Sequence, residues 1–182
     1  TLRKDLEGIL DGAYRAKDLV RQILSFSRRS DEETKPLKIQ LVVKEALKLL
    51  RSSIPTTIEI RQDINLDCAA VLANPTQIHQ IVMNLCINAR DALPAGGELQ
   101  VMTETVHLDE RSCLGFDLEQ PGAYAHIQVA DTGVGIAPEL LKRIFDPFFS
   151  TKSSEDASGL GLSVVWGVVK GLGGSCRIKS QP

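Results

Sequence analysis

The chain has 182 residues, of which 43% are hydrophobic and 24% charged, and its net charge is -2. This size and composition fit one globular domain with a short extra element. The near-neutral balance argues against a protein that binds nucleic acid or an anionic membrane, and no apolar run is long enough to span a bilayer. No signal peptide opens the sequence, so we expect a cytoplasmic location.

The two ends of the chain and its cysteines give two further expectations. The sequence begins without Met in a helical pattern and ends directly after a strand-like run, so we expect a fragment of a longer protein. The four cysteines, Cys68, Cys86, Cys113 and Cys176, lack metal-ligand spacing. We interpret them as reduced structural thiols.

Residues 1–29 have the pattern of one long helix. Apolar and small residues repeat at alternating spacings of four and three from Leu2 to Ser27, which is a heptad seam that a lone helix cannot bury. Leu10 and Leu24 widen the apolar face, so a helical bundle fits better than a two-stranded coiled coil. The alternative is an amphipathic helix packed on its own domain. We assign residues 1–30 to this element and the polar residues 31–36 to a linker.

An α/β pattern occupies residues 37–182. We predict strands near residues 37–41, 57–64, 69–73, 98–106, 123–130 and 176–179, and helices near 42–52, from 74 onward and near 162–170. The two longest strands alternate apolar and polar residues, which indicates a sheet with one buried face. We therefore predict an α+β fold with helices on one face of a mainly antiparallel sheet.

The helix that starts near residue 74 carries the most informative pattern. Asn74-Pro75 reads as an N-cap followed by proline at the first helical position. Asn84, Asn88 and Asp91 form a polar stripe, where amides and a carboxylate are costly unless they are hydrogen-bonded. A polar ligand or a metal ion would explain them, whereas the alternative is a solvated helix face. The polar stripe borders an apolar stripe made of Ile78, Val82, Leu85, Ala89 and Ala92.

Three later motifs suit a nucleotide site. Asp131-Thr-Gly-Val-Gly-Ile136 follows a strand, so its glycines allow close backbone approach and its aspartate can accept a hydrogen bond from an amine. Ile144–Lys152 contains three phenylalanines and leaves Thr151 and Lys152 at its rim. Ser153–Ser158 reads as a mobile lid, and Ser158-Gly-Leu-Gly-Leu162 opens a helix whose amides can bind phosphate. Taken singly, the first motif could be a plain loop and the second a hydrophobic plug of the core.

In this order the motifs resemble the four boxes of the sensor histidine kinases of two-component systems, in the GHKL ATPase superfamily. Asn84–Leu93 resembles the N box, Asp131–Ile136 the G1 box, Phe145–Lys152 the F box and Ser158–Leu162 the G2 box. The N and F boxes are most similar to the nitrogen-regulator and hybrid-kinase branch. Leu19–Arg28 resembles the second helix of the dimerisation and phosphotransfer domain. The resemblance implies a two-layer α/β sandwich, the Bergerat ATP-binding fold, preceded by that helix.

The resemblance also implies roles in binding ATP and Mg²⁺. Asn88 would bind Mg²⁺ through its side-chain oxygen, Asn84 would help hold the metal–triphosphate, and Asp131 would bind adenine. Magnesium fits because it prefers few protein oxygens completed by substrate phosphates. The implied ATP-binding residues are Asn84, Asn88, Asp91, Asp131, Gly133, Gly135, Ile136, Thr151, Lys152, Ser158, Gly159, Leu160, Gly161 and Leu162.

The implied activity is transfer of the γ-phosphoryl group of ATP to a histidine outside this chain. The first histidine is His79, which follows the dimerisation-type helix, and we interpret it, His107 and His126 as structural or surface residues. The implied partners are the phospho-acceptor domain, a response regulator receiver domain and a second copy of the parent protein, with no nucleic acid. Ala157 stands in place of the first G2 glycine, and we expect the family's final strand to be missing.

Two alternative functions stay open. A GHKL ATPase of the gyrase or mismatch-repair type would hydrolyse ATP, but those proteins have a glutamate four residues before the metal-binding asparagine. Here that position holds Asn84, which is a poor base. A non-catalytic nucleotide-binding and dimerisation module is the second alternative, and the intact Asn88, Asp131 and G2 glycines argue against it.

Overall fold

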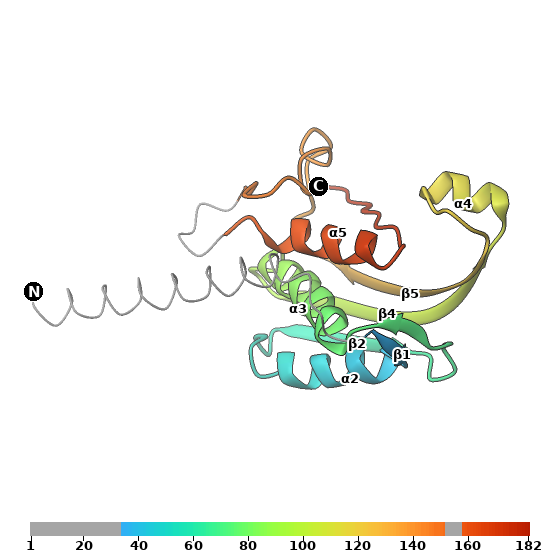
Figure 1. Cartoon of the computed structure of the whole chain (residues 1–182). Helices are drawn as coiled ribbons and strands as arrows, with labels where there is room; N and C mark the ends of the chain where they lie inside the picture. Colours follow the sequence, from blue (N-terminus) through green and yellow to red (C-terminus); the bar gives the residue numbers. More distant parts are fainter. Residues whose placement is uncertain (1–33, 152–157) are drawn as a thin grey trace, which may run out of the picture.

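A three-stranded sheet with helices on one face forms the body of the molecule (Figure 1). The computed structural model describes residues 34–151 and 158–182. The predicted helix of residues 1–30, residues 31–33 of the linker, Lys152 and lid residues 153–157 lie outside the described residues. In chain order the elements are β1 (Lys35–Leu37), α2 (Ile39–Leu50), β2 (Ile58–Ile64), β3 (Val71–Ala73), α3 (Pro75–Asp91), β4 (Gly97–Leu108), α4 (Glu110–Phe116), β5 (Gly122–Asp131) and α5 (Gly161–Gly171).

The main sheet has the strand order β2-β4-β5 and is mixed. β4 pairs antiparallel with β5, from Leu99 opposite Asp131 to Leu108 opposite Gly122. β2 pairs parallel with β4, whereas the sequence pattern predicts a mainly antiparallel sheet. The parallel pairing arises because β3 and α3 lie between the two strands in the chain, and such a crossover is what a parallel pair requires. β1 and β3 form a separate antiparallel pair.

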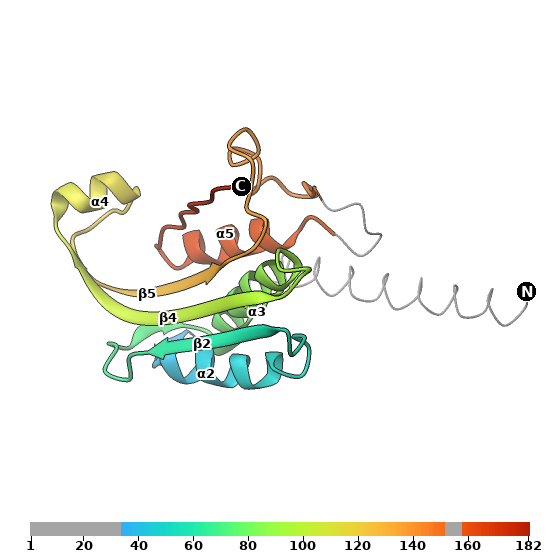
Figure 2. The same cartoon turned by 180° about the vertical axis from the view of Figure 1, so that it is seen from behind.

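The helices α2, α3 and α5 lie side by side on one face of the main sheet, with α3 in the middle (Figures 1 and 2). Seen from the other side, the strands lie in front of the helices (Figure 2). This arrangement confirms the predicted α+β fold with two layers. α3 is thus the helix that both other helices contact, and its polar residues can meet groups from α5.

The core lies between the inner face of β4 and the helices. Leu99, Val101 and Thr103 alternate along β4 and are almost completely buried, as the period-two pattern predicts. On α3, Ile78, Val82 and Ala89 of the predicted apolar stripe are buried, whereas Leu85 and Ala92 are only partly buried. Ile81 and Cys86 are buried instead, so the buried stripe is rotated slightly from the predicted one.

The start of the domain differs from the sequence prediction. Lys35 and Pro36, assigned to the linker, belong to β1, which is a short edge strand that tolerates proline. The strand predicted near residues 37–41 is wrong beyond Leu37, because α2 begins at Ile39. The alternation of Leu37, Ile39 and Leu41 favours a strand, but helical burial continues from Ile39 to Leu50, and Leu41 remains 58% exposed. Tertiary packing of the helical stripe decides the conformation.

Two further differences concern α4 and the C-terminal residues. The sequence pattern does not predict α4, whose start is marked by the N-cap Asp109 accepting a hydrogen bond from the Ser112 amide. The strand predicted at residues 176–179 is wrong, because within the described residues this segment pairs with no strand. Alternation alone does not make a strand when no neighbouring edge is engaged.

Candidate functional site

The polar stripe of α3 is the first part of the candidate site. Asn74 caps the helix, and its side-chain oxygen accepts a hydrogen bond from the Thr76 amide at 2.7 Å, so the predicted helix start is confirmed. Asn84 and Asn88 are one turn apart and partly buried. Asp91 forms an ion pair with the neighbouring Arg90 at 2.7 Å. This ion pair joins two neighbouring residues at the C-terminal end of α3.

The start of α5 lies against these asparagines. A Cβ placed on Gly161, the first residue of α5, would lie 3.5 Å from Asn88 Nδ2 and 3.9 Å from Asn84 Oδ1. The first-turn amides of any helix lack intrahelical acceptors and carry partial positive charge. The side chain of Ser158 accepts a long hydrogen bond, 3.4 Å, from the Leu160 amide just before the helix. Two amide side chains and a helix N-terminus therefore face a common space.

The loop after β5 is the third part. The Asp131 carboxylate accepts a hydrogen bond from the Gly133 amide at 2.9 Å, and the Val134 amide donates to the Ala92 carbonyl at 3.0 Å. A Cβ on Gly133 would lie 2.3 Å from that carbonyl oxygen, so no larger residue fits without moving the loop. Asp131 is exposed at the strand end, where it can accept a further hydrogen bond from a ligand.

These contacts bring some of the residues predicted from sequence together in two places along α3. Gly161 meets Asn84 and Asn88 in the C-terminal half of α3, and the Asp131 loop meets Ala92 directly after the helix. An acceptor carboxylate, two amide side chains and free helix amides are the groups that bind a base, a hydrated metal and phosphates, respectively. The residue pattern does not predict the role of the Ala92 carbonyl, because backbone groups leave no mark in it.

The phenylalanine-rich loop flanks the start of α5. The ring of Phe145 lies 4.9 Å from that of Trp166 on α5, and Arg143 lies 4.5 Å from the ring of Phe149. Phe148 is 69% exposed, and Gly159 packs against its backbone. Ile144 is buried and Phe145 and Phe149 are partly buried, but none of them belongs to the main hydrophobic cluster. Thr151 is exposed, and Lys152 lies outside the described residues.

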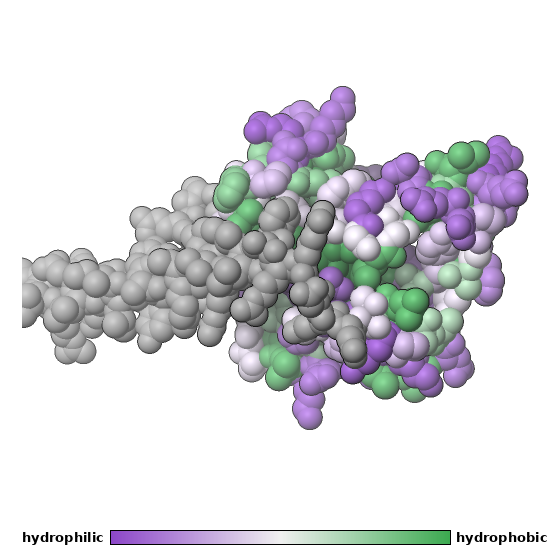
Figure 3. All heavy atoms as spheres, viewed as in Figure 1, coloured by the Kyte–Doolittle hydropathy of each residue, from purple (hydrophilic) through white to green (hydrophobic). Residues whose placement is uncertain are grey.

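The charged surroundings of the site are moderate. Hydrophilic side chains gather on the loop between β5 and α5 and on α4 (Figure 3). No cluster of three His, Cys, Asp or Glu residues suited to a metal occurs in residues 34–151 and 158–182. A divalent metal here would need amide oxygens together with oxygens of its ligand, and the partly buried Asn88 amide beside Gly161 suits that arrangement.

The cysteines and histidines of the domain have ordinary environments. All four cysteines are free, and burial raises the pKa of Cys86 to about 12. Its thiol is therefore neutral and unreactive near pH 7. His126 contacts Glu104 across β4 and β5 at 3.0 Å on the surface. No described helix is long and apolar enough to cross a membrane.

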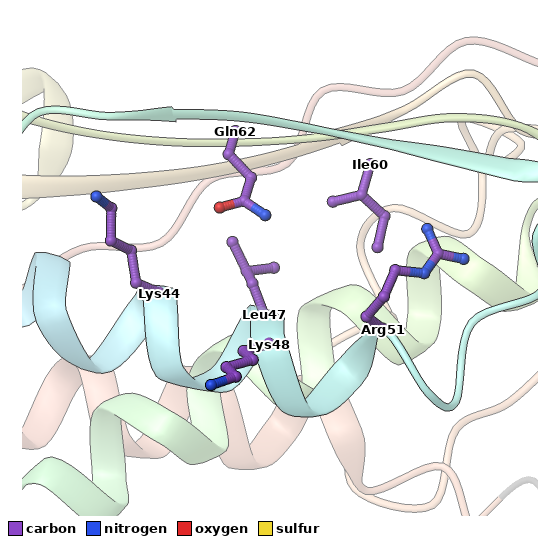
Figure 4. A pocket seen from close by; sticks show the side chains of 6 residues that line it. All are labelled: Lys44, Leu47, Lys48, Arg51, Ile60 and Gln62. Carbon is purple, nitrogen blue, oxygen red and sulfur yellow. The ribbon is translucent and has the colours of Figure 1, made fainter.

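A separate pocket of about 560 Å³ lies between α2 and β2 (Figure 4). Leu47 and Ile60 point toward each other across it, and Gln62 points in from β2. The guanidinium of Arg51 at its edge donates to the carbonyl oxygens of Ile54, Pro55 and Ile58. None of the predicted site residues lines this pocket, so it is unrelated to the motifs around α3.

Comparisons with known proteins agree with this geometry. The family described as histidine kinase-, DNA gyrase B- and HSP90-like ATPase matches residues 73–182. The sensor kinase CckA of Brucella abortus is 37% identical over 177 residues. The sensory histidine kinase/phosphatase NtrB of Rhizobium meliloti is 30% identical over 175 residues. A solved structure of the histidine kinase ThkA with the response regulator protein TrrA has a TM-score of 0.67 at 23% identity, which supports the fold alone.

The matches differ in how much of each protein they cover. The alignments with CckA and NtrB cover 97% and 95% of this chain. They cover only 19% of CckA and 45% of NtrB. The likeness to ThkA covers 96% of this chain and 46% of that chain. This chain therefore spans the equivalent of one part of these relatives.

Proposed function

Because the chain belongs to the histidine kinase-, DNA gyrase B- and HSP90-like ATPase family, we propose that it is the ATP-binding catalytic part of a sensor histidine kinase. In this proposal it transfers the γ-phosphoryl group of ATP to a histidine on a separate phospho-acceptor domain. The observation that carries the proposal is the approach of Asn84 and Asn88 on α3 to Gly161 at the start of α5. In the proposal, the two amide side chains, which can bind a metal ion, lie beside a helix N-terminus, which can bind phosphate.

Each part of the site has a proposed role. Asp131 accepts a hydrogen bond from the amino group of adenine, and the glycines at 133 and 135 let the loop lie close to the base. The amides of Gly161 and Leu162, with Ser158, Gly159 and Leu160 before them, bind phosphate oxygens. Asn88 holds Mg²⁺ through its side-chain oxygen, with Asn84 beside it. Bound Mg²⁺ would neutralise charge on the phosphates. The proposed site also includes Asp91, Ile136, Thr151 and Lys152.

The protein groups contribute mainly by positioning. Phosphoryl transfer needs little covalent help from a protein, because the main requirements are alignment of donor and acceptor and compensation of phosphate charge. Asn88 and the first-turn amides of α5 meet both requirements from two elements that pack against each other. The acceptor histidine would approach from outside the domain.

Hydrolysis of ATP is the second candidate function, since the family includes gyrase-type ATPases. Hydrolysis requires a base that activates water. Position 84 holds an asparagine, which is a poor base, and its amide lies beside Gly161. This chemistry favours transfer over hydrolysis. A non-catalytic nucleotide-binding module would need no metal ligand at position 88.

The proposed partners follow from the kinase activity. Residues 1–30 would belong to the dimerisation and phosphotransfer domain, so the parent protein would be a homodimer, and this part of it would lie in the cytoplasm. A response regulator receiver domain would accept the phosphoryl group from the histidine. The ATP-binding domain would begin with β1 at Lys35, and the seam from Leu2 to Ser27 would pack within a helical bundle.

Phosphotransfer with γ-labelled ATP tests the proposal. The 182-residue chain alone should take up no acid-labile label, because it lacks the acceptor. It should label a separately supplied dimerisation domain of a related kinase that carries the histidine. Asn88→Ala should abolish this labelling, while Asn65→Ala, the same change in a loop after β2, should not. Release of inorganic phosphate without any labelling of the acceptor would favour the ATPase, and a stable label on His79, His107 or His126 would contradict the assigned roles.

A further inference from the structure

The residues after α5 return to the loop that follows β5, where the C-terminus lies (Figure 1). Their burial alternates, because Cys176, Ile178 and Ser180 are partly buried while Arg177 and Lys179 are exposed. Cys176 packs against the hydrophobic core. Alternation with period two means that the side chains on one side of this extended segment face the protein. Ser180 lies on that side.

Ser180 contacts the end of the loop formed by residues 131–136. Its hydroxyl oxygen accepts a hydrogen bond from the Ile136 amide at 2.8 Å. Next to it, Gly135 has φ +71, and a Cβ there would lie 2.0 Å from the Gln181 carbonyl oxygen. The loop and the C-terminal segment are therefore in direct backbone contact, and only glycine permits that approach.

The loop is thus held at three points. The Gly133 amide bonds to Asp131 within the loop, and the Val134 amide bonds to Ala92 at the end of α3. The bond from the Ile136 amide to Ser180 holds the far end. Without an acceptor at position 180, the Ile136 amide would lose its partner in a partly buried position, which is unfavourable. The end of the loop would then be free to move relative to Asp131.

We infer that Ser180 is a positioning residue for adenine recognition: its hydroxyl holds the end of the 131–136 loop so that Asp131 presents its carboxylate to the base. This inference rests on the proposed function, in which Asp131 binds adenine. The segment that carries Ser180 follows α5, whose first residues form the proposed phosphate site. The loop for the base and the helix for the phosphates are thereby linked through one stretch of chain.

Two measurements on the full 182-residue chain test the inference. The first is hydrogen exchange of the Ile136 amide without nucleotide, which should be faster in Ser180→Ala and close to wild type in Ser180→Thr. The second is calorimetric affinity for ATP and GTP with Mg²⁺. Ser180→Ala should bind ATP roughly three- to tenfold more weakly, the range expected for one hydrogen bond, with a smaller effect on GTP. Ser180→Thr should restore the preference for ATP.

Ser52→Ala is the matched control, because Ser52 also makes one bond between a hydroxyl and the backbone, to the Leu49 carbonyl, far from the loop. Equal rates of hydrogen exchange at the Ile136 amide in the wild type and in Ser180→Ala would show that the contact is absent in solution. Equal weakening of ATP and GTP would overturn the positioning role and leave Ser180 a structural residue. If the wild type binds no ATP, the proposed function fails, whereas faster Ile136 exchange in Ser180→Ala would still support the loop contact alone.

Discussion

Gly159 and Phe148 lie in direct backbone contact, and both have left-handed backbone conformations, with φ of +65 and +66. A Cβ on Gly159 would lie 2.4 Å from the Phe148 carbonyl carbon. The left-handed region is costly for a bulky residue, and the exposed side chain of Phe148 does not offset that cost by burial. Such strain concentrates at functional segments. Here the contact between Gly159 and Phe148 connects the phenylalanine-rich loop to the residues just before α5.

Gly159→Ala should destabilise the domain by at least about 1 kcal/mol, because alanine is disfavoured at positive φ and its methyl would meet the Phe148 backbone. Chemical denaturation measures the change. Gly115→Ala is the control, since a Cβ at Gly115 meets nothing within 4 Å. Gly115→Ala should leave the stability of the domain unchanged or raise it. Equal stability of Gly159→Ala and the wild type would mean that the contact with Phe148 is absent in solution.

Gly161→Ala should separate nucleotide binding from stability. A Cβ at Gly161 makes only ordinary contacts, at 3.5 Å and beyond, and alanine is favoured over glycine in helices by roughly 0.5–1 kcal/mol. The midpoint of thermal unfolding should therefore stay the same or rise. The methyl group would occupy space between the α5 amides and Asn88, so ATP affinity should fall. Unchanged ATP affinity in calorimetry would show that phosphates bind elsewhere.

Asn88→Ala should remove the dependence of ATP affinity on Mg²⁺. The side-chain oxygen of Asn88 is the proposed metal ligand, and alanine offers no oxygen. Calorimetric titration with ATP in Mg²⁺ and in EDTA should give a large difference for the wild type and little for the variant. Asn65→Ala should behave like the wild type, because the Asn65 side chain accepts a bond from the Asp67 amide in the loop after β2. A variant that retains the full effect of Mg²⁺ would contradict the assignment.

Asp131→Asn should weaken binding of ATP and reduce the preference over GTP. Asparagine can still accept the bond from the Gly133 amide, so the loop should keep its shape. One carboxylate oxygen is replaced by an NH₂ donor, which cannot accept from the adenine amino group. Competition of ATP and GTP for the same site measures the preference. Asp63→Asn, on an exposed position of β2, is the control. Equal binding of both nucleotides by the wild type would count against this role.

The contact between Asp117 and Lys170 should weaken in acid. Lys170 Nζ donates to Asp117 at 2.7 Å, and this hydrogen bond with the positive charge of Lys170 lowers the pKa of Asp117 below its ordinary value of 3.8. A lowered pKa means that the ionised carboxylate stabilises the folded state above that ordinary value. The contribution is lost as the pH falls through the lowered pKa.

A titration of the Asp117 carboxyl by NMR measures this shift. In the wild type its midpoint should lie below 3.8, and in Lys170→Met it should return toward 3.8. Lys179→Met removes an exposed lysine near the C-terminus and should leave the midpoint unchanged. If Lys170→Met leaves it unchanged too, the contact between α4 and α5 does not persist in solution.

Local sequence signals were sufficient to predict the helices and strands whose residues alternate with a strong period. Asn74-Pro75 predicts the start of α3 because the cap and the proline act within one turn. Alternation predicts the buried face of β4, with Leu99, Val101 and Thr103 inside. The same alternation misled near Leu37–Leu41 and near residues 176–179, because burial in a helix or against a loop can also produce it.

The sequence by itself determined which chemical groups this domain offers, because the amides of Asn84 and Asn88, the Asp131 carboxylate and the glycines are written in the residue order. Only the tertiary structure decided which of them meet. Asn88 and Gly161 are brought together by the packing of α3 against α5, and the 131–136 loop meets the end of α3 through the bond from the Val134 amide to the Ala92 carbonyl. Contacts made by backbone groups and single hydroxyls, such as Ala92 and Ser180, depend on distances across the fold, and no local residue pattern encodes them.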